Sequence, residues 1–115
     1  MVARAYVPER GEVVWLSFSP QAGREQAGRR PALVLSAARY NRRTGLALVC
    51  PITSRVKGYP FEVALPDTGE VGGGVVLVDQ LRSLDWRARR AQAAGAVPPA
   101  VMNEVVAKLR PLLGG

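Results

Sequence analysis

The sequence predicts a mainly β fold, a small and mostly antiparallel barrel with a C-terminal helix. Two observations lead to this prediction. About five to seven short apolar stretches alternate with turn-rich segments, and one stretch near the end of the chain has apolar residues at helical spacing. A length of 115 residues is typical of one domain, so we expect a single domain over residues 1–115.

Apolar residues predict five strands in chain order. These strands are Val13–Phe18, Pro31–Ser36, Leu46–Ile52, Phe61–Leu65 and Val75–Val78. In the first strand, alternation places Val14, Leu16 and Phe18 on the core face. We expect Pro31 at the first residue of its strand, where no ladder donor is needed, and Pro51 at the end of the third strand.

The segments between the strands are rich in turn residues. Ser19–Arg29 is a polar loop, and Ala37–Thr44 is a loop or one short helical turn closed by Gly45. The pattern does not decide whether Leu81–Trp86 and Arg87–Gln92 form two short strands or one bent strand.

The C-terminal segment is predicted to be a helix. Pro98 and Pro99 suit its start, where the missing N–H would be unpaired in any case. Glu104 and Lys108 form an i,i+4 pair on the polar side, and Pro111 limits the regular part to about Leu109 or Arg110. The apolar stripe consists of Val101, Met102, Val105, Val106, Leu109, Leu112 and Leu113.

The residues that are missing exclude several kinds of chemistry. The chain has no histidine, which removes His acid–base catalysis, Ser–His and Cys–His pairs and nearly every zinc site. The single cysteine, Cys50, cannot form an internal disulfide, and its apolar strand suggests a small core residue. The carboxylates are scattered, so we expect no metal and no cofactor.

Net charge is the strongest functional signal. Sixteen Lys and Arg against nine Asp and Glu give +7, and fourteen of these cations are Arg. Such a surface favours polyanions, nucleic acid above all, because phosphate contacts release counterions. The simpler alternative is that an Arg-rich, Lys-poor chain partly reflects genomic base composition. We see neither a secretory signal nor a membrane span, and expect a cytoplasmic protein with no membrane partner.

Three polar loops adjoin apolar strands, whose ends are expected to bring them to one rim. They are GREQAGRRP (Gly23–Pro31), PITSRVKGYP (Pro51–Pro60) and DQLRSLDWRARR (Asp79–Arg90). These loops resemble the MazF/PemK/Kid mRNA interferase toxins, and MazF most closely, and so do GEVVWLSFSP, YNRRTG and the terminal helix. The resemblance runs from about Tyr6 to Leu113.

The resemblance implies a homodimeric SH3-like barrel of the MazF/PemK/CcdB type. It implies the toxin of a type II toxin–antitoxin pair, a metal-independent endoribonuclease that cuts single-stranded mRNA at short sequences and arrests growth. The products carry a 2′,3′-cyclic phosphate and a 5′-hydroxyl. An acidic, MazE-like antitoxin would inhibit it. The catalytic arginine of the family falls on Arg30, its catalytic threonine on Thr53 and its acidic loop residue on Glu25.

One position departs from the family pattern. Some MazF-like proteins carry His immediately before the catalytic arginine, whereas this chain has Arg29, so a titrating role for that position does not apply. The Asp and Arg used by PemK/Kid-type proteins are not carried over, because the matching stretch is MazF-like.

The residues themselves support the same chemistry. RNA is cut when its own 2′-hydroxyl attacks the adjacent phosphorus, a route that DNA lacks. Arg30 would hold the phosphoryl oxygens with its planar fork, Thr53 would hydrogen-bond the phosphate or the 2′-hydroxyl, and Glu25 is a better base than a guanidinium. The alternatives are an Arg30–Glu25 ion pair, a strand-end cap by Thr53 and a solvated Glu25.

Further polar residues of these loops are candidate RNA contacts. They are Gln26, Arg29, Asn41, Ser54, Arg55, Lys57, Gln80 and Arg87. Trp15 and Trp86 would stack on bases or, more simply, pack in the core or an interface. Two other functions compete with the ribonuclease: a non-catalytic gyrase poison on the related CcdB fold, and a basic barrel that only binds RNA.

Overall fold

The computed structural model describes residues 6–18, 28–69 and 71–115. Within these ranges the elements are β1 (Glu12–Phe18), β2 (Gly28–Val34), α1 (Ala38–Thr44), β3 (Leu46–Thr53), β4 (Glu62–Ala64), β5 (Val75–Leu77), the 3-10 turn η1 (Val78–Gln80), β6 (Arg82–Asp85), β7 (Gln92–Ala96) and α2 (Pro99–Leu112). The mainly β class with a C-terminal helix is therefore confirmed.

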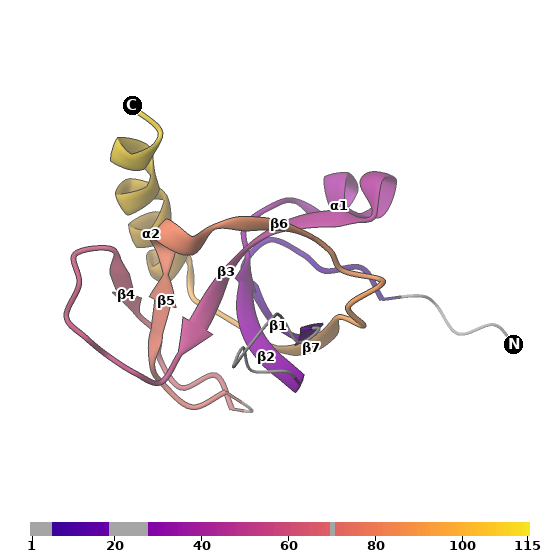
Figure 1. Cartoon of the computed structure of the whole chain (residues 1–115), viewed down its shortest axis with the longest axis horizontal. Helices are drawn as coiled ribbons and strands as arrows, with labels where there is room; N and C mark the ends of the chain where they lie inside the picture. Colours follow the sequence, from indigo (N-terminus) through magenta and orange to yellow (C-terminus); the bar gives the residue numbers. More distant parts are fainter. Residues whose placement is uncertain (1–5, 19–27, 70) are drawn as a thin grey trace, which may run out of the picture.

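The strands form one curled antiparallel sheet (Figure 1). In the described part of the chain its order is β4-β5-β3-β2-β1-β7, and β6 also pairs with β3. Helix α2 lies beside β4 at one end of the molecule, and α1 lies at the other end (Figure 1). No helix among the described residues is long and apolar enough to cross a membrane.

Strand β3 pairs with β2 along one edge and with two further strands along the other edge. Its first half pairs with β6 over Leu46–Val49, and its last residues pair with β5 at Ile52 and Thr53. Pro51 lies in the gap between these two partners, so its missing N–H interrupts neither ladder. For this reason β3 continues past Pro51 to Thr53, one residue beyond its predicted range.

Strand β2 begins three residues before its predicted start. Pro31 is thus an interior residue of the strand, opposite Trp15 of β1, and not its first residue. Pairing with β3 on the other side starts only at Ala32. A residue without an N–H is therefore tolerated at position 31, because no β3 ladder is present there.

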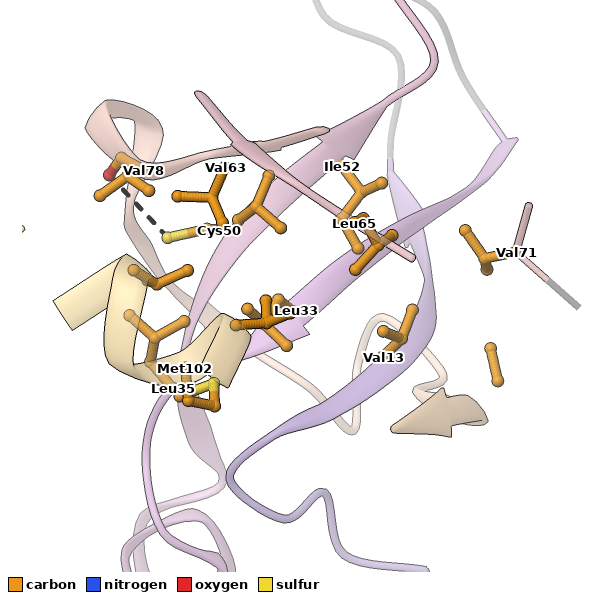
Figure 2. Close-up of a cluster of buried hydrophobic side chains, with 14 residues drawn as sticks. Val13, Leu33, Leu35, Cys50, Ile52, Val63, Leu65, Val71, Val78 and Met102 are labelled. Carbon is orange, nitrogen blue, oxygen red and sulfur yellow. Dashed lines mark hydrogen bonds between the residues drawn. The ribbon is translucent and has the colours of Figure 1, made fainter. Parts of the chain in front are cut away.

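Two hydrophobic clusters occupy opposite faces of the sheet, because successive strand residues alternate. The larger cluster, which α2 covers with Val101, Met102 and Val105, is shown in Figure 2. The smaller cluster contains Val14, Leu16, Ala32, Val34, Ala47, Val49, Leu84 and Trp86. Val14 and Leu16 share a face as predicted, while Val13 points to the larger cluster, so β1 is buried on both sides.

The turn between β6 and β7 corrects one prediction. Leu81–Trp86 contains a strand as expected, but most of Arg87–Gln92 is a turn, and β7 starts only at Gln92. The Asp85 carboxylate accepts the N–H of Ala88 at 2.9 Å and caps this turn. The chain therefore reverses where we had considered a second strand or a bend.

Helix α2 starts at Pro99 as predicted but extends beyond its predicted end, to Leu112. Pro111 costs the helix one N–H donor in its last turn, while the carbonyl oxygen of Leu109 still accepts from Leu113 at 3.2 Å. The predicted ion pair is present, with Lys108 Nζ 3.7 Å from Glu104 Oε2. Leu112 and Leu113 are exposed and do not belong to the buried stripe.

Candidate functional site

The first of the three polar loops lies largely outside the described residues. Glu25 and Gln26 both belong to this part, so their assignments remain predictions. The description resumes at Gly28, the first residue of β2.

Arg29 and Arg30 project to opposite faces of β2, as neighbours in a strand do. Arg30 is exposed and lies opposite Leu16 of β1. The Arg29 guanidinium donates to Ser17 Oγ at 2.8 Å and to the carbonyl oxygen of Arg90 at 2.8 Å. Arg29 thus ties β1 and β2 to the turn after β6, and its donors face the protein.

Arg30 and Thr53 lie just beyond the last residue pair of β2 and β3. That pair is Ala32 and Pro51, and each of the two residues lies two positions beyond it along its own strand, on the face that the pair shares. The pairing stops at Ala32 because β3 turns there to join β5. The Thr53 Oγ1 accepts the N–H of Arg55 at 3.1 Å, which holds the start of the following loop.

Gly74 comes very close to the backbone of Thr53. It has a φ of +106°, and a Cβ atom added to it would lie 2.5 Å from the carbonyl oxygen of Thr53. Only glycine fits such a position without moving its neighbour. The end of β3 is therefore held from this side by backbone packing.

A hollow of about 160 Å³ opens beside Thr53. It is formed by the end of β3, the loop after it, β4, β5 and η1. Its lining residues are Thr53, Arg55, Lys57, Tyr59, Phe61, Glu62, Leu77, Asp79 and Gln80. The hollow thus unites parts of the second and third polar loops, and its lining combines two cations, two carboxylates and two aromatic rings.

Four residues predicted from the sequence share this hollow: Thr53, Arg55, Lys57 and Gln80. Ser54 is exposed directly after Thr53, at the start of the same loop. The Lys57 Nζ lies 5.7 Å from the centre of the Tyr59 ring, within range of a cation–π contact. The end of β3 therefore presents cationic and aromatic groups side by side.

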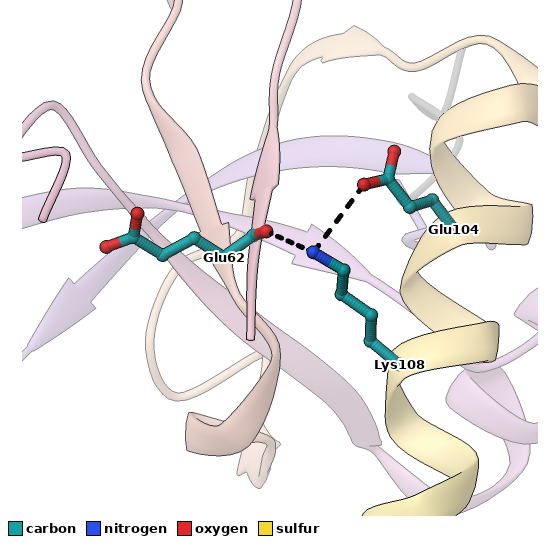
Figure 3. Close-up of polar contacts among 3 residues, drawn as sticks. All are labelled: Glu62, Glu104 and Lys108. Carbon is teal, nitrogen blue, oxygen red and sulfur yellow. Dashed lines mark hydrogen bonds and ion pairs between the residues drawn. The ribbon is translucent and has the colours of Figure 1, made fainter. Parts of the chain in front are cut away.

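Glu62 was missed in the sequence. It is a buried carboxylate in β4 whose two oxygens accept the N–H groups of Lys57 and Gly58, at 3.0 and 2.9 Å. Its backbone carbonyl accepts a hydrogen bond from Lys108 of α2 at 2.8 Å (Figure 3). A carboxylate inside the apolar stretch FEVAL was the signal, because buried charges need partners.

Asn41 does not fit its predicted role as an RNA contact. Its side chain is fully buried, and its amide nitrogen donates to the carbonyl oxygens of Pro8 and Ser36 at 2.8 and 3.1 Å. Its Oδ1 accepts from the Ser36 hydroxyl at 2.6 Å. The side chain holds α1 to neighbouring segments, so we leave it out of the site.

The two tryptophans considered for base stacking pack instead against the hydrophobic clusters of the protein. Trp86 is buried in the smaller cluster, and Trp15 packs against the larger one, as the simpler prediction had it. The guanidinium of Arg87, which is exposed, lies 4.9 Å from the centre of the Trp86 ring. Arg87 does not line the hollow at Thr53.

Cys50 is a buried core residue, as predicted. Burial, together with the nearby charge of Asp79, raises the pKa of its thiol to about 12, so it stays protonated and unreactive near neutral pH. Across the described ranges, no three Cys, Asp or Glu side chains gather as a metal site requires. The reactive groups on offer are thus guanidinium, hydroxyl, ammonium and carboxylate.

Comparison with known proteins gives a consistent result. A family model described as "PemK-like, MazF-like toxin of type II toxin-antitoxin system" matches residues 9–113. "Endoribonuclease toxin MazF" of Escherichia coli (strain K12) is 48% identical over 114 residues, which are 99% of this chain and 100% of that protein.

Solved structures from Deinococcus radiodurans are also similar. A crystal structure of MazE-MazF (Form-II) matches with a TM-score of 0.88 and 61% identity, covering 96% of this chain and 98% of that one. A crystal structure of MazF (Form-I) matches with a TM-score of 0.85 and 59% identity, covering 96% and 100%.

Proposed function

Since the chain belongs to the family of PemK-like, MazF-like toxins of type II toxin–antitoxin systems, we propose that it cleaves single-stranded mRNA at short sequences. Its relatives are named endoribonucleases, and this chain is an endoribonuclease toxin of the same kind. This activity distinguishes it from a gyrase poison and from a barrel that only binds RNA.

The proposed reaction is an internal transfer of the phosphoryl group. The ribose 2′-oxygen loses its proton and bonds to the adjacent phosphorus, while the bond from phosphorus to the 5′-oxygen breaks and that oxygen takes up a proton. The products are a 2′,3′-cyclic phosphate and a 5′-hydroxyl. This reaction needs neither water as nucleophile nor a metal ion.

Arg30 and Thr53 are the proposed catalytic residues. The planar guanidinium of Arg30 would bind the phosphoryl oxygens with two donors as negative charge builds up. Thr53 Oγ1 already accepts the N–H of Arg55, so its hydroxyl proton is directed elsewhere and would be donated to the phosphate. Glu25 is the proposed base, which takes the 2′-hydroxyl proton.

The observation that carries this proposal is the position of Thr53 at the hollow that Arg55, Lys57 and Gln80 also line, with Arg30 exposed on the neighbouring strand β2. The register of β2 and β3 supports the proposal that Arg30 and Thr53 act on the same phosphate. Arg55, Lys57 and Gln80 line the hollow and would bind the RNA next to the cut. A net charge of +7 favours the approach of a polyanion to this surface.

We further propose the partners of this single domain. MazE-MazF complexes are known for its relatives, and an acidic, MazE-like antitoxin would be attracted by the same positive surface as RNA. The active form would be a homodimer in the cytoplasm. Sedimentation at micromolar concentration tests this assembly, and a monomer would contradict it.

The activity is tested with purified protein, a mixed-sequence single-stranded RNA and EDTA. We expect fragments that begin with a 5′-hydroxyl and end with a cyclic phosphate. An RNA with hydrogen in place of the 2′-hydroxyl at the mapped cut should stay intact. Folded protein that leaves every RNA whole would favour the gyrase poison or the RNA-binding barrel instead. Sequencing the 5′-hydroxyl ends gives the recognition sequence.

A further inference from the structure

The loop between β3 and β4 is fixed by one carboxylate. The consecutive N–H groups of Lys57 and Gly58 both point at Glu62, one to each oxygen, at 3.0 and 2.9 Å. Gly58 has a φ of +80°, the left-handed conformation that aims two successive N–H groups at one anion. This arrangement typically binds a phosphate, and here the protein supplies the anion from its own strand.

Glu62 is itself held from two other sides. It pairs with Leu77 in the β4–β5 ladder, and its carbonyl oxygen accepts a hydrogen bond from Lys108 Nζ at 2.8 Å. The same ammonium group lies 3.7 Å from the carboxylate of Glu104 one helical turn away (Figure 3). The loop is thus connected through Glu62 to both the sheet and α2.

We propose that Glu62 is a positioning residue for RNA binding, which fixes the loop that carries Arg55, Lys57 and Tyr59. This inference rests on the proposed function. All three side chains line the hollow beside Thr53, and every residue from Ser54 to Pro60 is exposed. A loop ordered before binding avoids the entropy loss that a free loop suffers when RNA binds.

Simple electrostatics predicts that removing the charge of Glu62 strengthens RNA binding. A carboxylate that lines an RNA site repels phosphate, so loss of its charge alone would lower the Kd. Positioning predicts that its removal weakens binding, because the loop loses its fixed conformation. The direction of the change therefore distinguishes the two roles.

The test is Glu62→Gln, with Glu104→Gln as the matched control. Glutamine keeps the shape but offers one oxygen, so one of the two N–H groups would face an amide donor. We expect the KM for RNA to rise about tenfold. The Kd should rise by the same factor for an uncleavable RNA, in which hydrogen replaces the 2′-hydroxyl at the cut. The kcat should stay within about twofold, since Arg30 and Thr53 lie on other elements. Glu104→Gln removes the same charge, leaves the loop bonds intact and should not weaken binding.

Amide hydrogen exchange of Lys57 and Gly58 reports on the loop without using catalysis. Both amides should be protected in the wild type and exchange faster in Glu62→Gln. If that variant does not fold, Glu62→Asp keeps the charge, shortens the reach and should weaken binding in the same way. Fast exchange in the wild type, or unchanged or tighter RNA binding by a folded variant, overturns the inference. Failure of the proposed function is seen separately, as a wild type that leaves RNA intact.

Discussion

Trp86 and Asn41 are joined by a hydrogen bond between distant parts of the chain. The indole Nε1 of Trp86 donates to the backbone carbonyl oxygen of Asn41 at 2.9 Å, inside the smaller hydrophobic cluster. The side chain of Asn41 in turn bonds to Pro8 and Ser36. A single asparagine therefore joins α1 to the segment before β1 and to the residue that follows β6.

Asn41→Ala should lower the free energy of unfolding by about 3 kcal/mol, because several buried polar groups lose their partner. Chemical denaturation measures this loss, and Arg42→Ala on the exposed side of α1 is the control, with little expected change. An Asn41→Ala protein of normal stability that binds RNA poorly would restore the original prediction of an RNA contact.

Arg30→Lys should reduce kcat about 100-fold while leaving the thermal midpoint nearly unchanged. The charge remains, but the planar pair of donors for the phosphoryl oxygens is lost. Arg29→Lys is the matched comparison. The Arg29 guanidinium bonds to Ser17 and Arg90, so Arg29→Lys should lower the thermal midpoint more than Arg30→Lys does. It should reduce kcat less than Arg30→Lys does. Equal rates for Arg30→Lys and the wild type would remove Arg30 from the catalytic site.

Gly74→Ala should impair cleavage although residue 74 carries no functional group. A Cβ atom there would lie 2.5 Å from the carbonyl oxygen of Thr53, at a φ of +106° that alanine rarely adopts. The end of β3 must then shift, and a displacement of about 1 Å is expected to cost about 100-fold in kcat. Gly69→Ala, also at positive φ but with no atom within 4 Å, is the control for backbone strain alone. Similar kcat values for both variants would contradict this.

The buried thiol of Cys50 should make stability depend on pH in alkaline solution. Burial raises its pKa to about 12 in the folded protein, whereas the pKa of an exposed thiol is about 8.5. Its contribution is thus fully present below about pH 8.5 and is lost progressively as the pH rises toward 12, because only the unfolded chain loses the proton. The difference in unfolding free energy between the wild type and Cys50→Ala measures this. A difference that does not change between pH 7 and pH 10 would argue against it.

Most of the sheet could be predicted because its strands are apolar and bounded by turn residues. Strand β7 was missed because its sequence, QAAGA, consists of residues with weak strand propensity, and pairing with β1 alone makes it a strand. The proline positions were misjudged for a similar reason. Whether a missing N–H matters depends on which partner strand lies beside it, and a single sequence does not contain that information.

The candidate site could be predicted where polar residues directly follow the end of an apolar strand. Thr53, Arg55, Lys57 and Gln80 meet at one hollow, because they follow strands that end on the same side. Glu62 was missed because its role is to bind backbone N–H groups, which the sequence does not mark. The prediction for Asn41 failed because a polar residue in a basic stretch suggested solvent, whereas its helix turns it inward.

Strand β3 has hydrogen-bonded neighbours along most of its length, with β2 on one side and first β6, then β5, on the other. Amides enclosed in this way open only when most of the domain opens with them. Thr53 is the last residue of that strand and pairs there with β5, so the enclosed middle of β3 just before it anchors the segment that carries its hydroxyl. Partial unfolding near the chain ends would then leave the proposed centre of reaction in place, and loss of activity on heating should coincide with global melting.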